Sequence, residues 1–213
     1  VMFRRLSMIL GLCSAMLLAG CASGPRQFAF DEPELRSILV VPVINETNSV
    51  EADTLMHATA TTPLANMGYY AFPVDTVKFV LESESLYEPE RVRELGPVKL
   101  AEMFHADSVL FIKVTYWDAQ YIVLNTKTKV TAEYELFKAD GTSLWKDTVT
   151  FVKDSSSQNA SLIGLMVDAA VAAINRAAPD FRPLAKSANV YALRHWHVGP
   201  HVLEAAEKAQ QKQ

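Results

Sequence analysis

The alternation of apolar and polar positions predicts three consecutive strands in the middle of the chain. Residues 107–117 include the apolar run 109–112, which has the composition of a buried strand. Residues 127–138 alternate apolar with charged or hydroxyl side chains, which predicts a strand with one face in water. Asp140-Gly141 marks a tight turn, so residues 144–152 are expected to return as the antiparallel partner.

An earlier apolar run predicts a strand that is buried on both faces. Residues 38–43 are aliphatic apart from one proline, and the polar loop 45–49 follows at the carboxyl end of this strand. Apolar positions three to four residues apart then predict a helix over 52–67. Pro63 is expected to bend or interrupt this helix, and Gly68 to end it.

The remaining segments complete a fold of the α/β class. A short strand is predicted over 69–74, and helices over 75–86 and 97–104. The Ala-rich segment 161–178 is expected to form a helix that packs on the sheet or, alternatively, makes a helix-on-helix seam between two copies. This order predicts a three-layer-like α/β domain with a mixed sheet of about five strands, crossovers first and an antiparallel meander later.

The first twenty residues have the features of a lipoprotein signal peptide. Arg4 and Arg5 precede the apolar run 6–18, which is shorter than the roughly 20 residues of a membrane span but typical of a signal-peptide core. The run ends in Leu-Ala-Gly-Cys, which predicts cleavage between Gly20 and Cys21. A plain secretory signal peptide is the alternative.

Cys21 is therefore the predicted lipidation site. Acyl chains such as palmitate on its thiol and on the freed amine would give stable membrane anchoring, because two or more chains suffice for it. Ala22 and Ser23 follow the cysteine, and no Asp stands there to retain the protein in the inner membrane. We expect an outer-membrane lipoprotein that faces the periplasm.

Cleavage changes the composition of the chain. It leaves 193 of the 213 residues and shifts the net charge from −4 to −6, because the removed segment carries two arginines and no acidic residue. An acidic chain without a basic block is not expected to bind nucleic acid. No cysteine is left to form a disulfide. The expected organisation is a signal peptide (1–20), an acylated flexible tether on which Phe28 and Phe30 dock to the body (21–36), a single α/β domain (37–198), and a C-terminal tail or short helix (199–213).

The sequence contains no recognisable catalytic motif, so no enzyme, cofactor or metal site is expected. His195 and His197 would share one side of a strand and could hold a metal, but a polar C-terminal segment is the favoured interpretation. His57 and His105 are expected to be packed or surface residues. Tyr69-Tyr70 and Tyr116-Trp117 either line a groove or, as we favour, pack in the core and at the sheet edge.

Three segments resemble the bacterial lipoprotein family catalogued as domain of unknown function 799. They are Pro63–Val74, His105–Leu110 with Tyr116–Asp118, and Gly141–Trp145. Where that family tends to have glycine before the Ala-Asp pair, this chain has His105, with little expected consequence. The resemblance covers most of the chain and implies a fold similar to the N-terminal domain of TolB. It also implies gene neighbours that encode a lipoprotein similar to the curli secretion pore CsgG, and it carries over no catalytic residue.

These observations leave three functional hypotheses. The leading one is an accessory subunit of an envelope complex that binds a CsgG-like pore lipoprotein, other outer-membrane lipoproteins and a second copy of itself. The second is a ligand-binding accessory protein of an envelope transporter, with a ligand or partner surface at Asn45, Tyr69 and Tyr70 beside the carboxyl end of a strand. The third is a hydrolase or metal protein that uses the C-terminal histidines.

Overall fold

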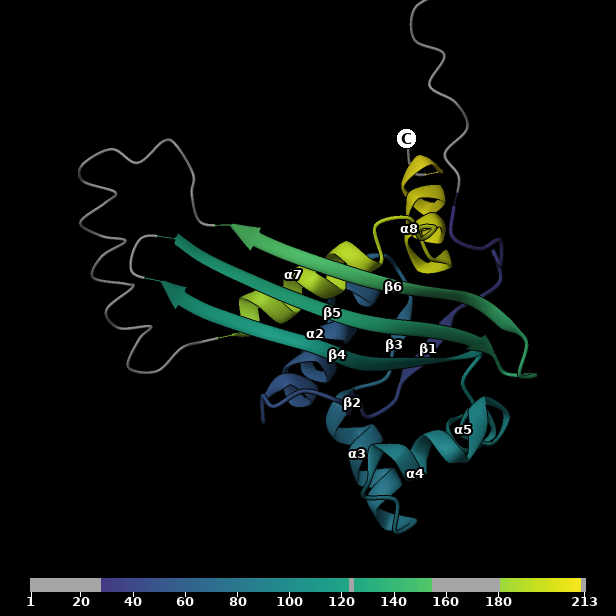
Figure 1. Cartoon of the computed structure of the whole chain (residues 1–213). Coiled ribbons are helices and arrows are strands. Elements are labelled where there is room, and N and C mark those ends of the chain that lie inside the picture. Colours follow the sequence, from purple (N-terminus) through teal and green to yellow (C-terminus); the bar gives the residue numbers. More distant parts are fainter. Residues whose placement is uncertain (1–27, 123–124, 155–180, 212–213) are drawn as a thin grey trace, which may run out of the picture.

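The computed structural model describes residues 28–122, 125–154 and 181–211, and shows one mixed β-sheet with helices on both faces (Figure 1). The strands are β1 (Ser37–Val40), β2 (Ile44–Asn45), β3 (Tyr70–Ala71), β4 (Ser108–Ile122), β5 (Asn125–Lys138) and β6 (Ser143–Asp154). The helices are α2 (Ala52–Asn66), α3 (Val74–Ser83), α4 (Pro89–Glu94), α5 (Gly96–Phe104), α7 (Arg182–Ala192) and α8 (Pro200–Gln210). The α/β class is confirmed.

The sheet combines parallel and antiparallel pairing in the expected order. Its strands run β3-β1-β4-β5-β6, and β2 continues beyond β1 to pair with β4. β1 is parallel to both β3 and β4, and β4, β5 and β6 form an antiparallel meander. The crossovers thus come first and the meander later, in a sheet of six strands where about five were expected.

The strand β1 is buried on both faces, as its composition predicts. Ile38 and Val40 point into one apolar core, whereas Leu39 and Val41 point into a second core on the other face. All four are at most 1% exposed. Burial of each such side chain stabilises the fold by about 1.5–3 kcal/mol, which makes β1 the centre of the domain.

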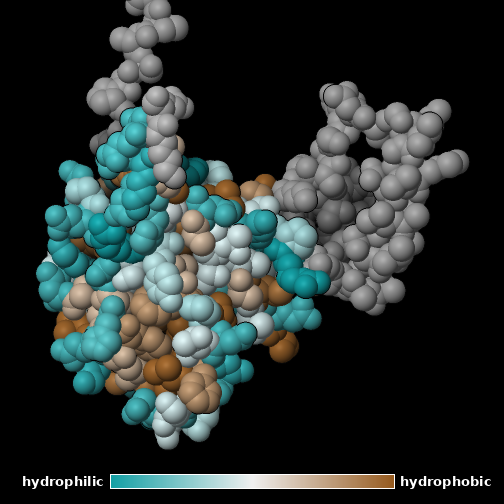
Figure 2. All heavy atoms as spheres, turned by 180° about the vertical axis from the view of Figure 1, so that it is seen from behind, coloured by the Kyte–Doolittle hydropathy of each residue, from teal (hydrophilic) through white to brown (hydrophobic). Residues whose placement is uncertain are grey.

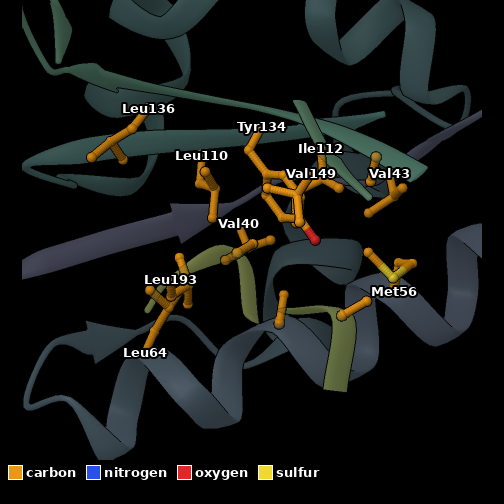
Figure 3. Packing of buried hydrophobic residues seen from close by; sticks show 14 of the residues in the cluster. Val40, Val43, Met56, Leu64, Leu110, Ile112, Tyr134, Leu136, Val149 and Leu193 are labelled. Carbon is orange, nitrogen blue, oxygen red and sulfur yellow. The ribbon is translucent and has the colours of Figure 1, made fainter. Parts of the chain in front are cut away.

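The first core lies between the sheet and the helices α2 and α7. Figure 3 shows Leu64 and Met56 facing Val40 and the side chains that descend from β4 and β5. In the same view the Tyr134 ring reaches from the sheet towards the helices and carries its hydroxyl oxygen into the helical layer. This large core joins segments from both halves of the chain.

The second core lies under α3, α4 and α5. Val77 and Leu81 of α3, Val92 of α4 and Leu100 of α5 are buried there against the other face of β1 and β4. Beyond this layer, Glu133 of β5 forms an ion pair with Lys113 at 3.0 Å. The wet face predicted for residues 127–138 is confirmed at Lys129, Thr131 and Glu133, whereas Glu135 is largely buried beside Arg93 of α4.

Three of the helices differ from the expectations. α2 is not interrupted at Pro63, because this residue lies in the last turn and its carbonyl still accepts a bond from the Met67 N–H at 3.0 Å. Helix α4, with six residues, is too short to produce a visible period. Helix α7 was also missed, although Pro183 stands at its start. The helix expected over 161–178 lies outside the described residues.

The backbone conformation of His105 explains why glycine suits the position before the Ala106-Asp107 pair. His105 ends α5 in the left-handed conformation, with φ of 52°, which costs a non-glycine residue roughly 1–2 kcal/mol. Asp107 then accepts hydrogen bonds from Ser37 N–H and Ser37 Oγ, at 2.8 and 2.9 Å. This carboxylate fastens the start of β1 to the start of β4, and His105 forms the left-handed turn that leads into it.

Candidate functional site: the junction of the two chain ends

The N-terminal and C-terminal segments meet at one end of the domain, beside the turn between α2 and β3. We call this region, residues 28–36, 67–71 and 194–204, the junction. The Ala29 N–H donates to the His195 carbonyl at 2.9 Å, and the Phe28 ring stacks on the His197 ring with centroids 3.5 Å apart. Residues 28–36, which fall within the expected tether, therefore lie on the body of the domain.

An aromatic cluster fixes the inner side of the junction. Trp196 is only 4% exposed, and the rings of Phe30 and Trp145 meet it edge to face with centroids 5.0 Å away. Tyr69 meets the same indole edge to face at 6.2 Å. Each such pair adds about 0.5–1.5 kcal/mol beyond burial. The cluster joins the first described residues of the chain to β6, to the α2–β3 turn and to the C-terminal segment.

Two glycines allow the backbones of the junction to touch. Gly68 follows α2 with φ of +91°, and its carbonyl accepts the His201 N–H at 3.3 Å. The Gly199 N–H donates to the Met67 carbonyl at 2.6 Å. A Cβ on Gly199 would stand 2.6 Å from the carbonyl carbon and oxygen of Gly68, so this crossing needs glycine on both sides.

Replacing Gly199 by alanine is expected to lower the free energy of unfolding of the mature domain by about 2 kcal/mol. The added methyl group meets backbone atoms that cannot rotate away, and overpacking of this kind costs about 1–3 kcal/mol. Urea unfolding followed by tryptophan fluorescence measures the change. Val198→Ala, at a neighbouring position that is 49% exposed, is the matched control with little expected effect. Equal stability of the two variants would contradict the close approach.

Tyr69 is the buried member of the tyrosine pair in the junction. Its hydroxyl donates to the His197 carbonyl at 3.1 Å, and burial raises its pKa to about 12. The phenol therefore stays protonated and holds the C-terminal segment in place. Its neighbour Tyr70 is 51% exposed at the sheet edge.

Two hollows open near the junction. The smaller, about 80 Å³, is lined by Asp31, Glu32, Pro33, Tyr69, His197, Val198, Pro200 and Leu203. The larger, about 310 Å³, is lined by Glu32, Glu34, Leu35, Asp107, Lys138, Ala139 and Asp140. Three of its charged groups make contacts within the domain: Lys138 pairs with Glu32 at 3.2 Å, and Asp107 accepts a hydrogen bond from the Ser37 N–H at 2.8 Å.

The residues proposed as one ligand surface are not brought together. Asn45 closes its own loop: its side chain accepts from Thr47 N–H at 3.0 Å and donates to the Ser49 carbonyl at 2.7 Å. Along the sheet Asn45 pairs with Val114, whereas Tyr70 pairs with Ser37 at the opposite end of β1. Measured along β4, Val114 is seven residues beyond residue 107, which lies beside Ser37. At roughly 3.3 Å per residue, Asn45 and Tyr70 are therefore about 23 Å apart along the strand direction. Asn45 and the tyrosines therefore do not line a common groove.

The C-terminal histidines do not lie on a strand. His195 and His197 belong to the irregular segment between α7 and α8, and His201 lies in the first turn of α8. Throughout residues 28–122, 125–154 and 181–211, no group of three His, Cys, Asp or Glu side chains is arranged to hold a metal ion. The alternative in which His195 and His197 share one side of a strand does not hold, because the chain turns at this point. Cys21 and Gly20 lie outside the described residues.

Other residues that the sequence did not single out hold the helices to the sheet. Asn189 of α7 is 1% exposed and accepts the Tyr134 hydroxyl at 3.0 Å. Its amide donates to the Met56 carbonyl and to Thr59 Oγ1, at 3.0 and 2.9 Å. Asn189 lies on the apolar side of α7, among the buried residues Leu184, Ala185, Ala188 and Ala192. A polar residue on the apolar side of a helix is a recognisable sequence signal, but it becomes visible only once the helix itself is predicted.

Buried His57 also has a structural partner. Its Nε2 donates to the Val40 carbonyl at 3.1 Å, in the tautomer that this geometry requires. Burial lowers the pKa of the imidazole, which opposes protonation at this position. The packed role expected for His57 agrees with this environment.

Together, the fold and the junction define a class: a mixed-sheet α/β domain whose N-terminal entry is fastened to its C-terminal end. The chain belongs to the GNA1162-like family, described as "Putative lipoprotein GNA1162-like", whose model matches residues 27–198. The likeness to a lipoprotein family is thus confirmed. Within the described part of the chain, no helix is long and apolar enough to cross a membrane.

Individual relatives agree with this family. A lipoprotein of Neisseria meningitidis serogroup B, NMB1124/NMB1162, is 32% identical over 178 residues, which cover 81% of this chain and 83% of that protein. The crystal structure of lipoprotein GNA1162 from Neisseria meningitidis is also 32% identical, with a TM-score of 0.52 over 66% of this chain and 99% of that one. A PelC dodecamer structure from Paraburkholderia phytofirmans is 18% identical, with a TM-score of 0.48 over 81% of this chain and 93% of that one. This last similarity is too low to carry functional information.

Proposed function

We propose that this lipoprotein is anchored through acyl chains on Cys21 in the inner leaflet of the outer membrane. Its domain faces the periplasm and acts as a non-catalytic accessory subunit of an envelope complex with a CsgG-like pore lipoprotein. Family membership supports the anchor, and the Leu-Ala-Gly-Cys sequence supports its position. The likeness to the N-terminal domain of TolB and the pore partner follow from the sequence resemblance and remain predictions.

The polar groups inside the domain support a binding role over catalysis. The buried Asn189 and Tyr134 use their polar atoms in the bond that holds α7 to the sheet. His57 is bound to a strand carbonyl. A catalytic acid or base needs to reach a substrate, and these groups are occupied by the fold.

The observation that carries the proposal is the apolar surface of the α3–α5 layer. Phe79 of α3 is 73% exposed and Tyr87, just after that helix, is 66% exposed. Leu95 and Val98 in the same layer are 36% and 43% exposed. Figure 2 shows brown and tan surface gathered on the lower part of the molecule, below the hydrophilic region around α8. Exposed apolar surface of this kind marks interaction sites on soluble domains.

Affinity capture from solubilised outer membranes tests this role. Acylated wild-type protein is expected to co-purify with a second outer-membrane lipoprotein, and Phe79→Glu to lose it. Val50→Glu introduces the same charge at a residue that is 90% exposed in the loop before α2, and serves as the matched control. Recovery of no other lipoprotein by the wild type, even after cross-linking in the native envelope, would count against the proposal.

A further inference from the structure

We propose that the exposed apolar side chains of the junction, Phe28, Val198, Val202 and Leu203, form a surface that contacts the phospholipid leaflet carrying the anchor. This inference rests on the proposed acylation of Cys21. It adds a fixed orientation to the anchor: the junction lies against the lipid, and the α3–α5 layer and the Asn45 loop remain in the periplasm.

The short segment between Cys21 and Phe28 indicates that the junction is the end of the domain nearest the membrane. Six residues lie between Cys21 and Phe28, and the seven residue-to-residue steps from one to the other span at most about 25 Å when fully extended. Strand β4 alone has 15 residues, which corresponds to about 50 Å. The tether is therefore shorter than the sheet, so it brings the junction close to the membrane while the other end of the sheet extends away.

The attachment of Phe28 keeps the tether from lengthening. Its ring stacks on His197 at 3.5 Å, and Ala29 is hydrogen-bonded to His195. Phe30 is 9% exposed beside the Trp196 ring. Release of this segment would expose the buried Phe30 ring to water, which is unfavourable. Residues 28–30 therefore stay on the body of the domain, and only the residues before them can act as the tether.

The apolar side chains gather where the tether meets the domain. Phe28 is 43% exposed, Val198 49%, Val202 41% and Leu203 51%. Val198 and Leu203 line the same small hollow as His197, on which Phe28 stacks, and Val202 stands directly over Gly68. Four large apolar side chains, contributed by both chain ends, are thus presented to solvent within one region.

Helix α8 is placed to lie at the lipid surface. Figure 1 shows it rising from the body beside residues 28–36, and among its residues only Pro200 is buried. Its first turn carries Val202 and Leu203, and the side of the helix visible in Figure 2 is hydrophilic. A short helix with apolar residues near its attached end and polar residues elsewhere suits the boundary between headgroups and acyl chains.

The charges around this surface indicate that apolar contact, and not attraction to anionic lipid, drives the interaction. Arg36 is already paired with Glu204 at 2.7 Å, and Asp31 and Glu32 line the adjoining hollow. Lys208 is the basic residue in the last turn of α8. The guanidinium of Arg194 lies over the Tyr191 ring, 4.0 Å from its centroid. Among the described residues of the junction, basic side chains are thus mixed with acidic ones and do not form the kind of cluster that anionic membranes attract. We therefore expect contact with zwitterionic phospholipid, with little dependence on salt.

Site-directed fluorescence tests the contact in the acylated protein. Cys13 leaves with the signal peptide and Cys21 is acylated, so one introduced cysteine is the sole reactive thiol. Leu203→Cys and, as a second position, Val198→Cys are labelled with a polarity-sensitive dye and reconstituted in phosphatidylethanolamine vesicles. Val50→Cys, in the loop beyond the opposite end of β1, is the matched control. Quenching by nitroxide-labelled lipid is expected to be at least twofold stronger at residues 203 and 198 than at residue 50.

The outcomes separate this inference from the proposed function. Equal water accessibility at all three positions, in protein that floats with the vesicles, would overturn the contact surface and leave the anchor intact. Labels at 203 and 198 that are shielded from water but not quenched by lipid would instead identify a second copy as the partner, which also overturns it. Failure of the wild-type protein to float would refute the acyl anchor itself.

Discussion

Replacement of Cys21 by alanine is expected to abolish incorporation of labelled palmitate and to release the domain from its lipid anchor. In the proposed anchor the thiol and the freed amine of Cys21 carry the acyl chains, and each buried methylene group of such a chain contributes about 0.8 kcal/mol to membrane binding. Without an acylated cysteine, cleavage between Gly20 and residue 21 is also expected to fail. The precursor should therefore accumulate at the expense of the mature form of 193 residues.

Cys13→Ala is the matched control for this experiment. This residue lies in the segment that is removed, so its loss should leave acylation, cleavage and fractionation unchanged. Labelling with palmitate, intact mass and separation of envelope fractions measure the three effects. A Cys21→Ala protein that is processed and fractionates as the parent does would show that the chain reaches its location in another way.

Replacement of Asn189 by alanine is expected to lower the free energy of unfolding by about 3–4 kcal/mol. The substitution leaves the Tyr134 hydroxyl without its acceptor in a buried position, which costs about 1–3 kcal/mol. It also removes the bonds to the Met56 carbonyl and Thr59 Oγ1, and leaves a space between α7 and α2. Because domains are stable by only about 5–15 kcal/mol, the loss should be plain in a urea titration.

A double-mutant cycle isolates the bond between the sheet and α7. Tyr134→Phe should cost about 1–2 kcal/mol in the parent chain and close to nothing once Asn189 is alanine, because the partner is then already absent. Val190→Ala, at the adjacent and half-exposed position on α7, should change stability by less than about 0.5 kcal/mol. A comparably small effect of Asn189→Ala would show that this network is not what holds α7 to the domain.

The sequence predicted well those elements in which burial and exposure follow a regular pattern along the chain. The apolar run 38–43 predicts burial on both faces, and the consecutive residues Leu39 and Val40 do enter opposite cores. The alternation over 127–138 reported one wet face, and Glu133 lies on it. Helix α4 has six residues and escaped prediction because less than two turns cannot establish a period. Helix α7 was missed even though Leu184, Ala188 and Ala192 mark a buried side.

The candidate site was harder to predict than the fold. The sequence predicts a possible ligand or partner surface that combines Tyr69 and Tyr70 with Asn45. The two tyrosines belong to the segment that carries the family resemblance. In the structure the C-terminal residues pack on this segment instead. Gly199 touches the Gly68 backbone, and the Tyr69 hydroxyl donates to the His197 carbonyl. The sequence offers the side chains of His195 and His197 as possible metal ligands. In the structure it is their backbone carbonyls that make contacts across the junction, with the Ala29 N–H and the Tyr69 hydroxyl.

The α/β class and the strands whose faces alternate between water and core follow from the sequence without the structure, and the signal segment and Cys21 stay predictions from it. The tertiary structure alone decided that Phe28 lies on His197, that Gly68 touches Gly199 and that Asn189 receives the Tyr134 hydroxyl. The physical reason is that periodicity records whether a residue faces water or the core. It does not record which residue, 55 or more positions away, lies on the other side of the contact.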